Sequence, residues 1–115
     1  MAWTVLTSGE YDAWWTGLSE DAQVSVAVVV RLLQEQGPLL PRPYCDTLKG
    51  SKLANLKELR VQHRGRPHRV LFAFDPKRCA ILLTGGDKSR DPRWYERSIR
   101  LAEAAWQRHL ASLRP

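Results

Sequence analysis

The sequence predicts an α+β fold in a single domain spanning residues 1–115, with the element order β-α-α-β-β-β-α. Three observations predict it: a valine-rich segment between helix start and stop signals, apolar alternation with a period of two between residues 56 and 84, and a helical stripe near the C-terminus. We expect a small, mainly antiparallel sheet with the two N-terminal helices packed on one face, and a C-terminal helix. A chain of this length buries roughly two-thirds of its unfolded surface, which suffices for an ordinary core.

The N-terminal third is expected to contain one strand and two helices. β-branched and aromatic side chains predict a short strand from Trp3 to Thr7. Four apolar residues then recur at the spacing of one helical face: Tyr11, Trp14, Trp15 and Leu18. Ser19 suits the N-cap of a second helix that runs to about Gln36 and stops at Gly37-Pro38. Its valines favour a strand, but its length and its termination signals favour a helix.

An irregular connection over residues 44–55, with a turn at Lys49-Gly50, leads into a predicted β-hairpin. The hairpin covers residues 56–74, and its turn is His63-Arg64-Gly65-Arg66. Period-2 alternation sets the register of the two strands. It pairs Leu59 with Val70, and Arg60 with Arg69.

A second hairpin turns at Asp75-Pro76, the first two positions of a type I turn. Its expected pairs are Phe72 with Ile81 and Val70 with Leu83, which puts Thr84 beside Arg69. Residues 80–83 are apolar on both parities, as in a central strand that is covered on both faces. Gly85-Gly86 is then expected to let the chain turn.

The last predicted element is a helix with Asp91 as its N-cap and Pro92 at its first position. Its apolar stripe is formed by Tyr95, Ile99, Ala102, Trp106 and Leu110. Four arginines are left facing water or a partner: Arg93, Arg97, Arg100 and Arg108.

The pairing of Arg60 with Arg69 needs an explanation, because like charges directly across two strands are destabilising. A multivalent anion such as an RNA phosphate would relieve the repulsion. The alternative is that Glu58, which lies diagonal to Arg69 on the same face, neutralises the pair in a solvated patch.

Charge and composition narrow the function further. Residues 1–40 carry a balance of −4 and residues 41–115 a balance of +10, which indicates an acidic partner such as nucleic acid or an acidic protein. The longest apolar run, Val26–Val30, is too short to span a membrane, and no signal peptide is visible, so we expect a cytoplasmic location. Cys45 and Cys79 and the three histidines lack metal-ligand spacing, so neither a metal nor a cofactor is expected.

Three features converge at one end of the predicted sheet. They are the arginine pair, the Gly85-Gly86-Asp87-Lys88 turn, and the positive N-terminus of the last helix, and together they predict a phosphate site. Tyr95 lies one turn into that helix. His68 borders Arg69 but points to the opposite face. The spacing of a P-loop is absent, as is a Ser-His-Asp or Cys-His set.

At these positions the sequence resembles the RelE/ParE superfamily of type II toxins, within it the HigB-like (phage Gp49-like) branch. The resemblance covers about residues 10–112. The matching segments are Leu56-Lys-Glu-Leu-Arg60, Gly65-Arg-Pro-His-Arg69-Val-Leu-Phe-Ala-Phe-Asp-Pro76, Ile81-Leu-Leu-Thr-Gly-Gly-Asp-Lys88, Trp94-Tyr95 and His109-Leu110. His68 departs from the pattern, since this branch more often has an aromatic residue such as Tyr there.

The resemblance implies a small toxin that cleaves mRNA on the translating ribosome and is neutralised by a helix-turn-helix antitoxin. It implies that Arg60 and Arg69 contact the scissile phosphate, and that Lys88 and Tyr95 stand near the reacting groups. We expect further RNA contacts from Lys57, Arg66, His68, Arg90, Arg93 and Arg97. Lys57 ranks lowest, because it shares the parity of Leu59 and turns toward the core.

Metal-free RNA cleavage uses the 2′-OH as the nucleophile, so a protein must align it, stabilise negative charge and move two protons. We expect Lys88 to be the general base, and Tyr95 or His68 to be a proton donor or a ring that stacks on a base. Two alternatives remain open: a non-enzymatic ParE-like toxin that binds DNA gyrase, and a non-toxic basic RNA-binding phage-type protein.

Overall fold

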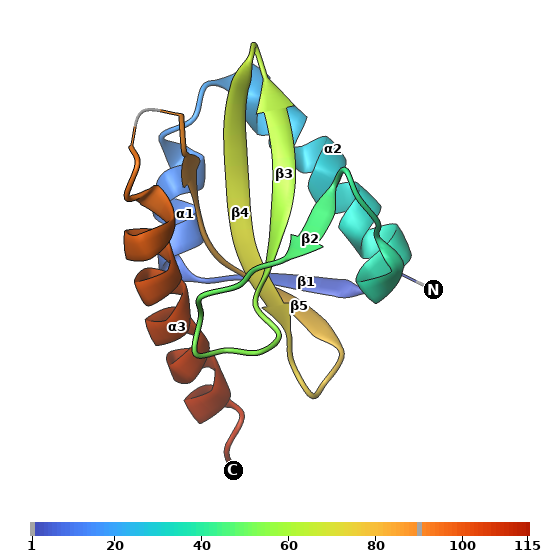
Figure 1. Ribbon diagram of the computed structural model, residues 1–115. Helices are drawn as coiled ribbons and strands as arrows, with labels where there is room; N and C mark the ends of the chain where they lie inside the picture. Colours follow the sequence, from blue (N-terminus) through green and yellow to red (C-terminus); the bar gives the residue numbers. More distant parts are fainter. Residues whose placement is uncertain (1, 90) are drawn as a thin grey trace.

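A mixed five-stranded sheet with the strand order β1-β5-β4-β3-β2 lies between two helical layers (Figure 1). The computed structural model describes residues 2–89 and 91–115. Its strands are β1 (Thr4–Thr7), β2 (Cys45–Thr47), β3 (Lys57–His63), β4 (Arg66–Phe74) and β5 (Cys79–Asp87). Its helices are α1 (Gly9–Thr16), α2 (Glu20–Gln36) and α3 (Trp94–Ser112), with a 3₁₀ turn at Gly37–Leu39. The α+β class is confirmed.

The order of the elements matches the prediction except for one strand. β2 lies inside the segment that was expected to be irregular, and it pairs antiparallel with the start of β3. Three residues are too few to show a period, so the sequence contained no usable signal for this strand. β1 pairs parallel with β5, which makes the sheet mixed.

Helix α2 begins and ends where its signals place it. The Ser19 hydroxyl accepts a hydrogen bond from the Ala22 N–H at 3.2 Å, as expected of an N-cap, and the helix ends at Gln36. The buried face of α2 carries Val26, Val29 and Leu33. Burial of this face against the sheet therefore outweighs the strand preference of its valines.

The hairpin of β3 and β4 has the predicted register. Leu59 pairs with Val70 and Arg60 pairs with Arg69. Arg64 and Gly65 in the turn adopt φ values of 50° and 75°, which match the left-handed residues of a two-residue hairpin turn. The turn type and the apolar alternation act on the same short segment, so they specify one register.

The predicted register of the β4–β5 hairpin is wrong. Phe72 pairs with Leu82 instead of Ile81, and Arg69 lies beside Gly86 instead of Thr84. The Arg78 N–H donates to the Asp75 carbonyl at 3.0 Å, as the expected turn requires, but Arg78 then adds a residue at φ 65°. An irregularity between Leu71 and Phe72 adds a second shift, so Val70 lies opposite Gly85 instead of Leu83.

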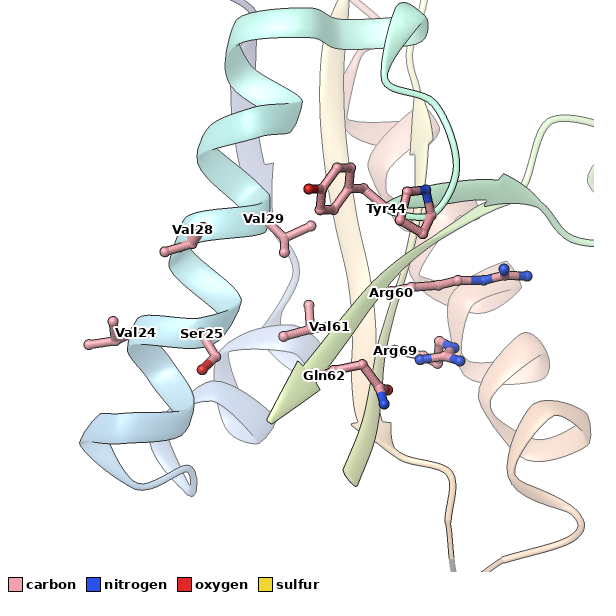
Figure 2. Close-up of a pocket in the computed structure, with 10 residues that line it drawn as sticks. Val24, Ser25, Val28, Val29, Tyr44, Arg60, Val61, Gln62 and Arg69 are labelled. Atoms are coloured by element: carbon pink, nitrogen blue, oxygen red, sulfur yellow. The ribbon is translucent and has the colours of Figure 1, made fainter. Parts of the chain in front are cut away.

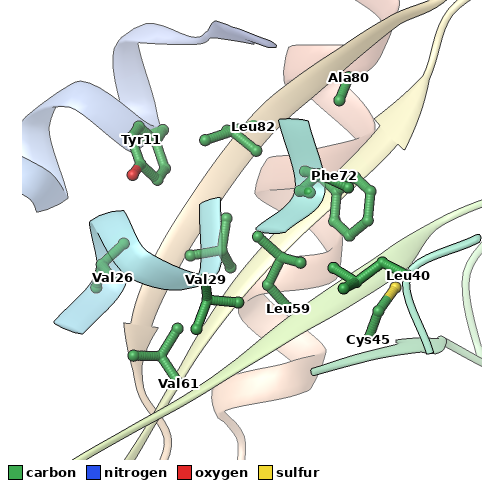
Figure 3. Packing of buried hydrophobic residues seen from close by; sticks show 12 residues of the cluster. Tyr11, Val26, Val29, Leu40, Cys45, Leu59, Val61, Phe72, Ala80 and Leu82 are labelled. Atoms are coloured by element: carbon green, nitrogen blue, oxygen red, sulfur yellow. The ribbon is translucent and has the colours of Figure 1, made fainter. Parts of the chain in front are cut away.

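The two faces of the sheet bury separate apolar cores. On the α1–α2 face, Leu59 and Phe72 pack with Val26 and Val29 of α2 (Figure 3). The side chains on the other face of the sheet pack under α3. They are Leu71, Ala73, Ile81 and Leu83, and they form one cluster with Ile99, Ala102 and Trp106 of α3. The expectation that residues 80–83 are covered on both faces is therefore confirmed.

Gly85 and Gly86 do not form a turn, because β5 continues through them to Asp87. Instead they admit two tryptophans on opposite faces of the strand. A Cβ at Gly85 would lie 2.2 Å from the Trp14 ring, and a Cβ at Gly86 would lie 2.2 Å from Nε1 of Trp94. These glycines thus serve close packing.

The last helix begins two residues later than predicted. Asp91 Oδ1 accepts from the Arg93 N–H at 2.9 Å, and the Trp94 N–H donates to the Asp91 carbonyl at 3.1 Å. Asp91 and Pro92 therefore form a turn that leads into α3 at Trp94. Within residues 2–89 and 91–115, no helix is both long and apolar enough to cross a membrane.

Candidate functional site

Arg60 of β3 and Arg69 of β4 lie side by side on the α3 face of the sheet and point away from α2 (Figure 2). Both side chains line a cavity of about 550 Å³ at the edge of the sheet. The Arg60 side chain is 35% exposed and that of Arg69 is 12% exposed. The predicted arginine pair is therefore present and reachable from solvent, chiefly through Arg60.

Glu58 joins the two arginines. Its side chain is only 4% exposed, its Oε2 lies 3.3 Å from Arg60 Nη2, and its Oε1 lies 3.4 Å from Arg69 Nε. Glu58 thus contacts both guanidinium groups, as the alternative explanation for the arginine pair expects. The patch differs from the expected solvated one because the carboxylate is buried beneath the first turn of α3, where it accepts a hydrogen bond from Tyr95.

The arginine pair is not fully neutralised. Asp46 of β2 binds Arg60 Nη2 at 3.2 Å and also Arg42 Nη2 at 2.7 Å. The hydrogen bond from Arg42 lowers the pKa of Asp46, so this carboxylate stays charged. Three guanidinium groups thus meet two carboxylates in this cluster, which leaves one positive charge for an incoming anion.

Tyr95 reaches the same cluster from the first turn of α3. Its hydroxyl donates a hydrogen bond to Glu58 Oε1 at 2.6 Å. Burial and the hydrogen bond to Glu58 raise the pKa of Tyr95, which keeps the phenol protonated at neutral pH. Lys88, directly after β5, holds its Nζ 5.4 Å from the centre of the Tyr95 ring. The structure therefore brings together Arg60, Arg69, Tyr95 and Lys88.

Two of the expected RNA contacts lie on the other face of the sheet. Lys57 has the parity of Leu59 and donates to Thr47 Oγ1 at 3.2 Å. His68 is buried between the rings of Trp14 and His63, and its burial lowers the pKa of the imidazole. Neither side chain is brought to the arginine pair.

The remaining expected contacts lie around the end of the sheet and the start of α3. Arg66 pairs with Asp87 at 3.2 Å, and Arg97 pairs with Asp91. Arg93 is exposed. Arg90 lies outside the described residues. These exposed side chains can contact a large anion, but they do not enter the cluster around Glu58.

Sequence reasoning missed Asp46 as a partner of Arg60, because Asp46 belongs to the unpredicted strand β2. Among the residues that the structure describes, no three His, Cys, Asp or Glu side chains gather closely enough to hold a metal ion. Cys45 is a buried free thiol and Cys79 a half-buried one.

Comparison with known proteins agrees with the fold and the motifs. The family described as phage-derived protein Gp49-like matches residues 13–107. The putative toxin HigB2 of Mycobacterium tuberculosis is 43% identical over 101 residues, which are 86% of this chain and 50% of HigB2. The putative toxin HigB3 of the same organism is 42% identical over 109 residues, 94% of each chain. The chain thus spans about half the length of HigB2 and nearly all of HigB3.

Two solved structures share the fold at low sequence identity. The isolated E. coli RelE toxin has a TM-score of 0.61 at 13% identity, covering 87% of this chain and 99% of RelE. A chain of the RelBE2 toxin-antitoxin complex of M. tuberculosis has a TM-score of 0.54 at 17% identity, covering 76% and 99%. The resemblance seen in the sequence is confirmed: the chain belongs to the Gp49-like family, in its HigB branch, and has the RelE fold.

Proposed function

We propose that this chain is the toxin of a type II toxin-antitoxin system and that it inhibits translation by cleaving mRNA on the ribosome. The observation that carries the proposal is the gathering of Arg60, Arg69, Tyr95 and Lys88, with the Arg60 and Arg69 side chains beside an open cavity. Cationic groups aimed at a phosphate stabilise the charge that develops during phosphoryl transfer. The two HigB relatives, each described as a putative toxin, support the same assignment.

The proposed reaction is attack of the 2′-OH on the adjacent phosphate. The 2′-oxygen bonds to phosphorus while the bond to the 5′-oxygen breaks, which leaves a 2′,3′-cyclic phosphate and a 5′-hydroxyl. Lys88 is the proposed general base for the 2′-OH proton, and Tyr95 donates a proton to the leaving 5′-oxygen. Arg60 and Arg69 stabilise the added negative charge. His68 takes no part, because it lies on the other face of the sheet.

The substrate has to share the site with Glu58. This carboxylate already accepts the Tyr95 hydroxyl and holds both arginines, so the leaving oxygen must replace it as the acceptor of the Tyr95 proton. Glu58 thereby keeps the three side chains oriented before RNA binds. Such preorganisation reduces the cost of arranging charges at the moment of reaction.

The proposed partners are a cognate antitoxin of the helix-turn-helix type, the ribosome and mRNA, in the cytoplasm. The antitoxin is supported by the RelBE2 structure, which is a toxin-antitoxin complex. The reaction as written requires no cofactor, because the 2′-OH supplies the nucleophile.

One observation favours a second candidate function. Glu58 and Asp46 neutralise most of the charge on the arginines, as expected of a site that does not bind a phosphate. The second candidate is a non-enzymatic ParE-like toxin that binds DNA gyrase. A non-toxic RNA-binding protein is the remaining possibility.

The test is to induce the chain in cells and to map mRNA 5′ ends together with plasmid supercoiling. Cuts in phase with codons at the ribosomal A site support the proposal. Supercoiling defects without cuts favour gyrase binding, and neither effect favours the non-toxic protein. The Arg60→Ala variant should abolish the cuts and the growth arrest. The matched control is Arg31→Ala, because Arg31 is an exposed arginine on α2 that pairs with Glu35. Full toxicity of a folded Arg60→Ala variant would contradict the proposed site.

A further inference from the structure

Two carboxylates face each other across the strands β2 and β3. Asp46 of β2 lies directly opposite Glu58 of β3 in the antiparallel register. Like charges in this arrangement repel one another. The guanidinium group of Arg60 offsets the repulsion, because its Nη2 atom is 3.2 Å from Asp46 Oδ2 and 3.3 Å from Glu58 Oε2. One nitrogen of Arg60 therefore serves both carboxylates.

The two carboxylates are held very differently. Glu58 is 4% exposed, accepts the Tyr95 hydroxyl and contacts Arg69 as well as Arg60. Displacing it would leave the nearly buried Arg69 guanidinium without its partner, which is costly. Asp46 is 23% exposed and belongs to an edge strand of only three residues. Of the two carboxylates on Arg60, Asp46 is therefore the one that a ligand can displace.

The Asp46 carboxylate has a second guanidinium group to pair with. Its Oδ2 is 2.7 Å from Arg42 Nη2, which is closer than its contact of 3.2 Å with Arg60 Nη2. Its Oδ1 accepts a hydrogen bond from the Thr47 N–H at 2.9 Å. When Asp46 leaves Arg60, it keeps both of these partners. The exchange therefore breaks only one partly exposed ion pair, and such pairs contribute little stability.

We propose that Asp46 is a displaceable counter-ion of Arg60, and that an RNA phosphate takes its place on Arg60 while Arg42 retains the carboxylate. The inference rests on the proposed function and describes how access to that same site is controlled. Before RNA binds, Asp46 reduces the repulsion between Arg60 and Arg69, and afterwards the phosphate does so. Asp46 and Arg42 are thus positioning residues, since both act on the RNA through Arg60.

This exchange explains how arginines that are largely neutralised in the free protein can still bind a phosphate. A phosphodiester carries one negative charge, as the Asp46 carboxylate does, so replacing one by the other on Arg60 gains little free energy. RNA that makes only this contact therefore binds weakly. RNA that is also held elsewhere, as on the ribosome, has further contacts that favour the exchange.

The first experiment measures how tightly the full chain binds a fluorescein-labelled single-stranded RNA with methylated 2′-oxygens, which has no 2′-OH to attack its phosphates. Asp46→Asn removes the charge but keeps an oxygen for the Thr47 N–H, and should tighten binding about fivefold by fluorescence anisotropy. Glu35→Gln is the matched control, because it removes the same charge from another exposed arginine, Arg31. Equal effects of the two substitutions would show that only net charge matters and would overturn the proposal.

A double-mutant cycle tests whether Arg42 acts through Asp46. Arg42→Ala leaves Asp46 with Arg60 alone and should weaken RNA binding about threefold. In an Asp46→Asn background the same substitution should cost no more than Arg31→Ala, which removes an exposed arginine of α2. An equal and larger loss in both backgrounds would mean that Arg42 contacts RNA itself, and would overturn the proposed exchange.

A conservative variant separates charge from local structure. Asp46→Glu keeps a carboxylate on β2, so its affinity for RNA should stay close to that of the wild type. Circular dichroism checks that each variant is folded. If Asp46→Glu tightens RNA binding as much as Asp46→Asn does, a change in the packing of β2 is responsible and the proposal is wrong.

Cleavage assays on translating ribosomes separate this inference from the proposed function. Asp46→Asn should lower the concentration of ribosome-bound mRNA that gives the half-maximal rate, whereas a distorted site would lower the maximal rate instead. If Asp46→Asn tightens the methylated RNA in a chain that cleaves no mRNA, the exchange at Arg60 stands and the ribonuclease assignment fails. If mRNA is cleaved and Asp46→Asn binds RNA like the wild type, only the exchange fails.

Discussion

The hydroxyl of Tyr95 donates a hydrogen bond to Glu58 Oε1 at 2.6 Å, and this contact ties the first turn of α3 to strand β3. The same carboxylate holds Arg60 and Arg69. Residues far apart in the sequence thus contact the two oxygens of one buried carboxylate. Glu58 is the link between the stability of the fold and the arrangement of the proposed active site.

Replacing Glu58 should destabilise the protein. Glu58→Ala leaves the nearly buried Arg69 guanidinium without its carboxylate, and we expect the free energy of unfolding to fall by about 3 kcal/mol. Urea denaturation measures the change. Glu96→Ala is the control, because Glu96 forms an exposed pair with Arg100, worth about 0.5 kcal/mol or less. Similar losses for both variants would show that Glu58 is no more than a surface charge.

Replacing Tyr95 should affect cleavage more than RNA binding. Tyr95→Phe keeps the ring beside Lys88 but removes the proton donor, so we expect mRNA cleavage to fall by about 10²-fold or more. Primer extension on a translated message measures the rate, and anisotropy measures RNA affinity. Tyr11→Phe is the matched control, since Tyr11 is buried in the α1–α2 core. Cleavage by Tyr95→Phe at the wild-type rate would remove the phenol from the reaction.

Asp87 should contribute stability that is lost in acid. Burial alone would raise the pKa of Asp87, but hydrogen bonds from Ser89 and Arg66 outweigh it and lower the pKa from 3.8 to about 2. Because the folded-state pKa is depressed, the contribution is complete above 3.8 and disappears as the pH falls through about 2. The Asp87→Asn variant should therefore have a lower free energy of unfolding than the wild type near neutral pH. This difference should shrink as the pH falls from 3.8 to about 2. Urea denaturation midpoints of both proteins, measured from neutral pH down to about 2, test this prediction. A stability difference that does not change with pH would refute it.

Adding a methyl group at Gly85 should disrupt packing. The new Cβ would lie 2.2 Å from the Trp14 ring, and we expect a loss of about 2 kcal/mol. In a Trp14→Ala background the same substitution should cost much less, because the overlapping ring is gone. Gly9→Ala is the control, with no atom within 4 Å of the added Cβ. Thermal denaturation of the four variants provides the comparison, and an unchanged cost in both backgrounds would contradict the packing role.

Local patterns predicted the parts of the fold that local forces determine. The β3–β4 hairpin was predicted in register because Arg64 and Gly65 form its turn directly between the strands they join. The limits of α2 followed from Ser19 and Gly37 for the same reason. By contrast, the β4–β5 register depends on Arg78 and on a bulge near Leu71, neither of which changes the apolar pattern.

The sequence by itself determined the α+β class, the arginine pair and the family, since these rest on periodicity and short motifs. Only the tertiary structure decided that α3 buries Glu58 between Arg60, Arg69 and Tyr95, and that His68, which the sequence already turned to the opposite face, packs against the Trp14 ring. Both depend on how helices pack on the two faces of the sheet. Which helix covers a face, and which polar group it then isolates from water, is decided by contacts between residues distant in the chain.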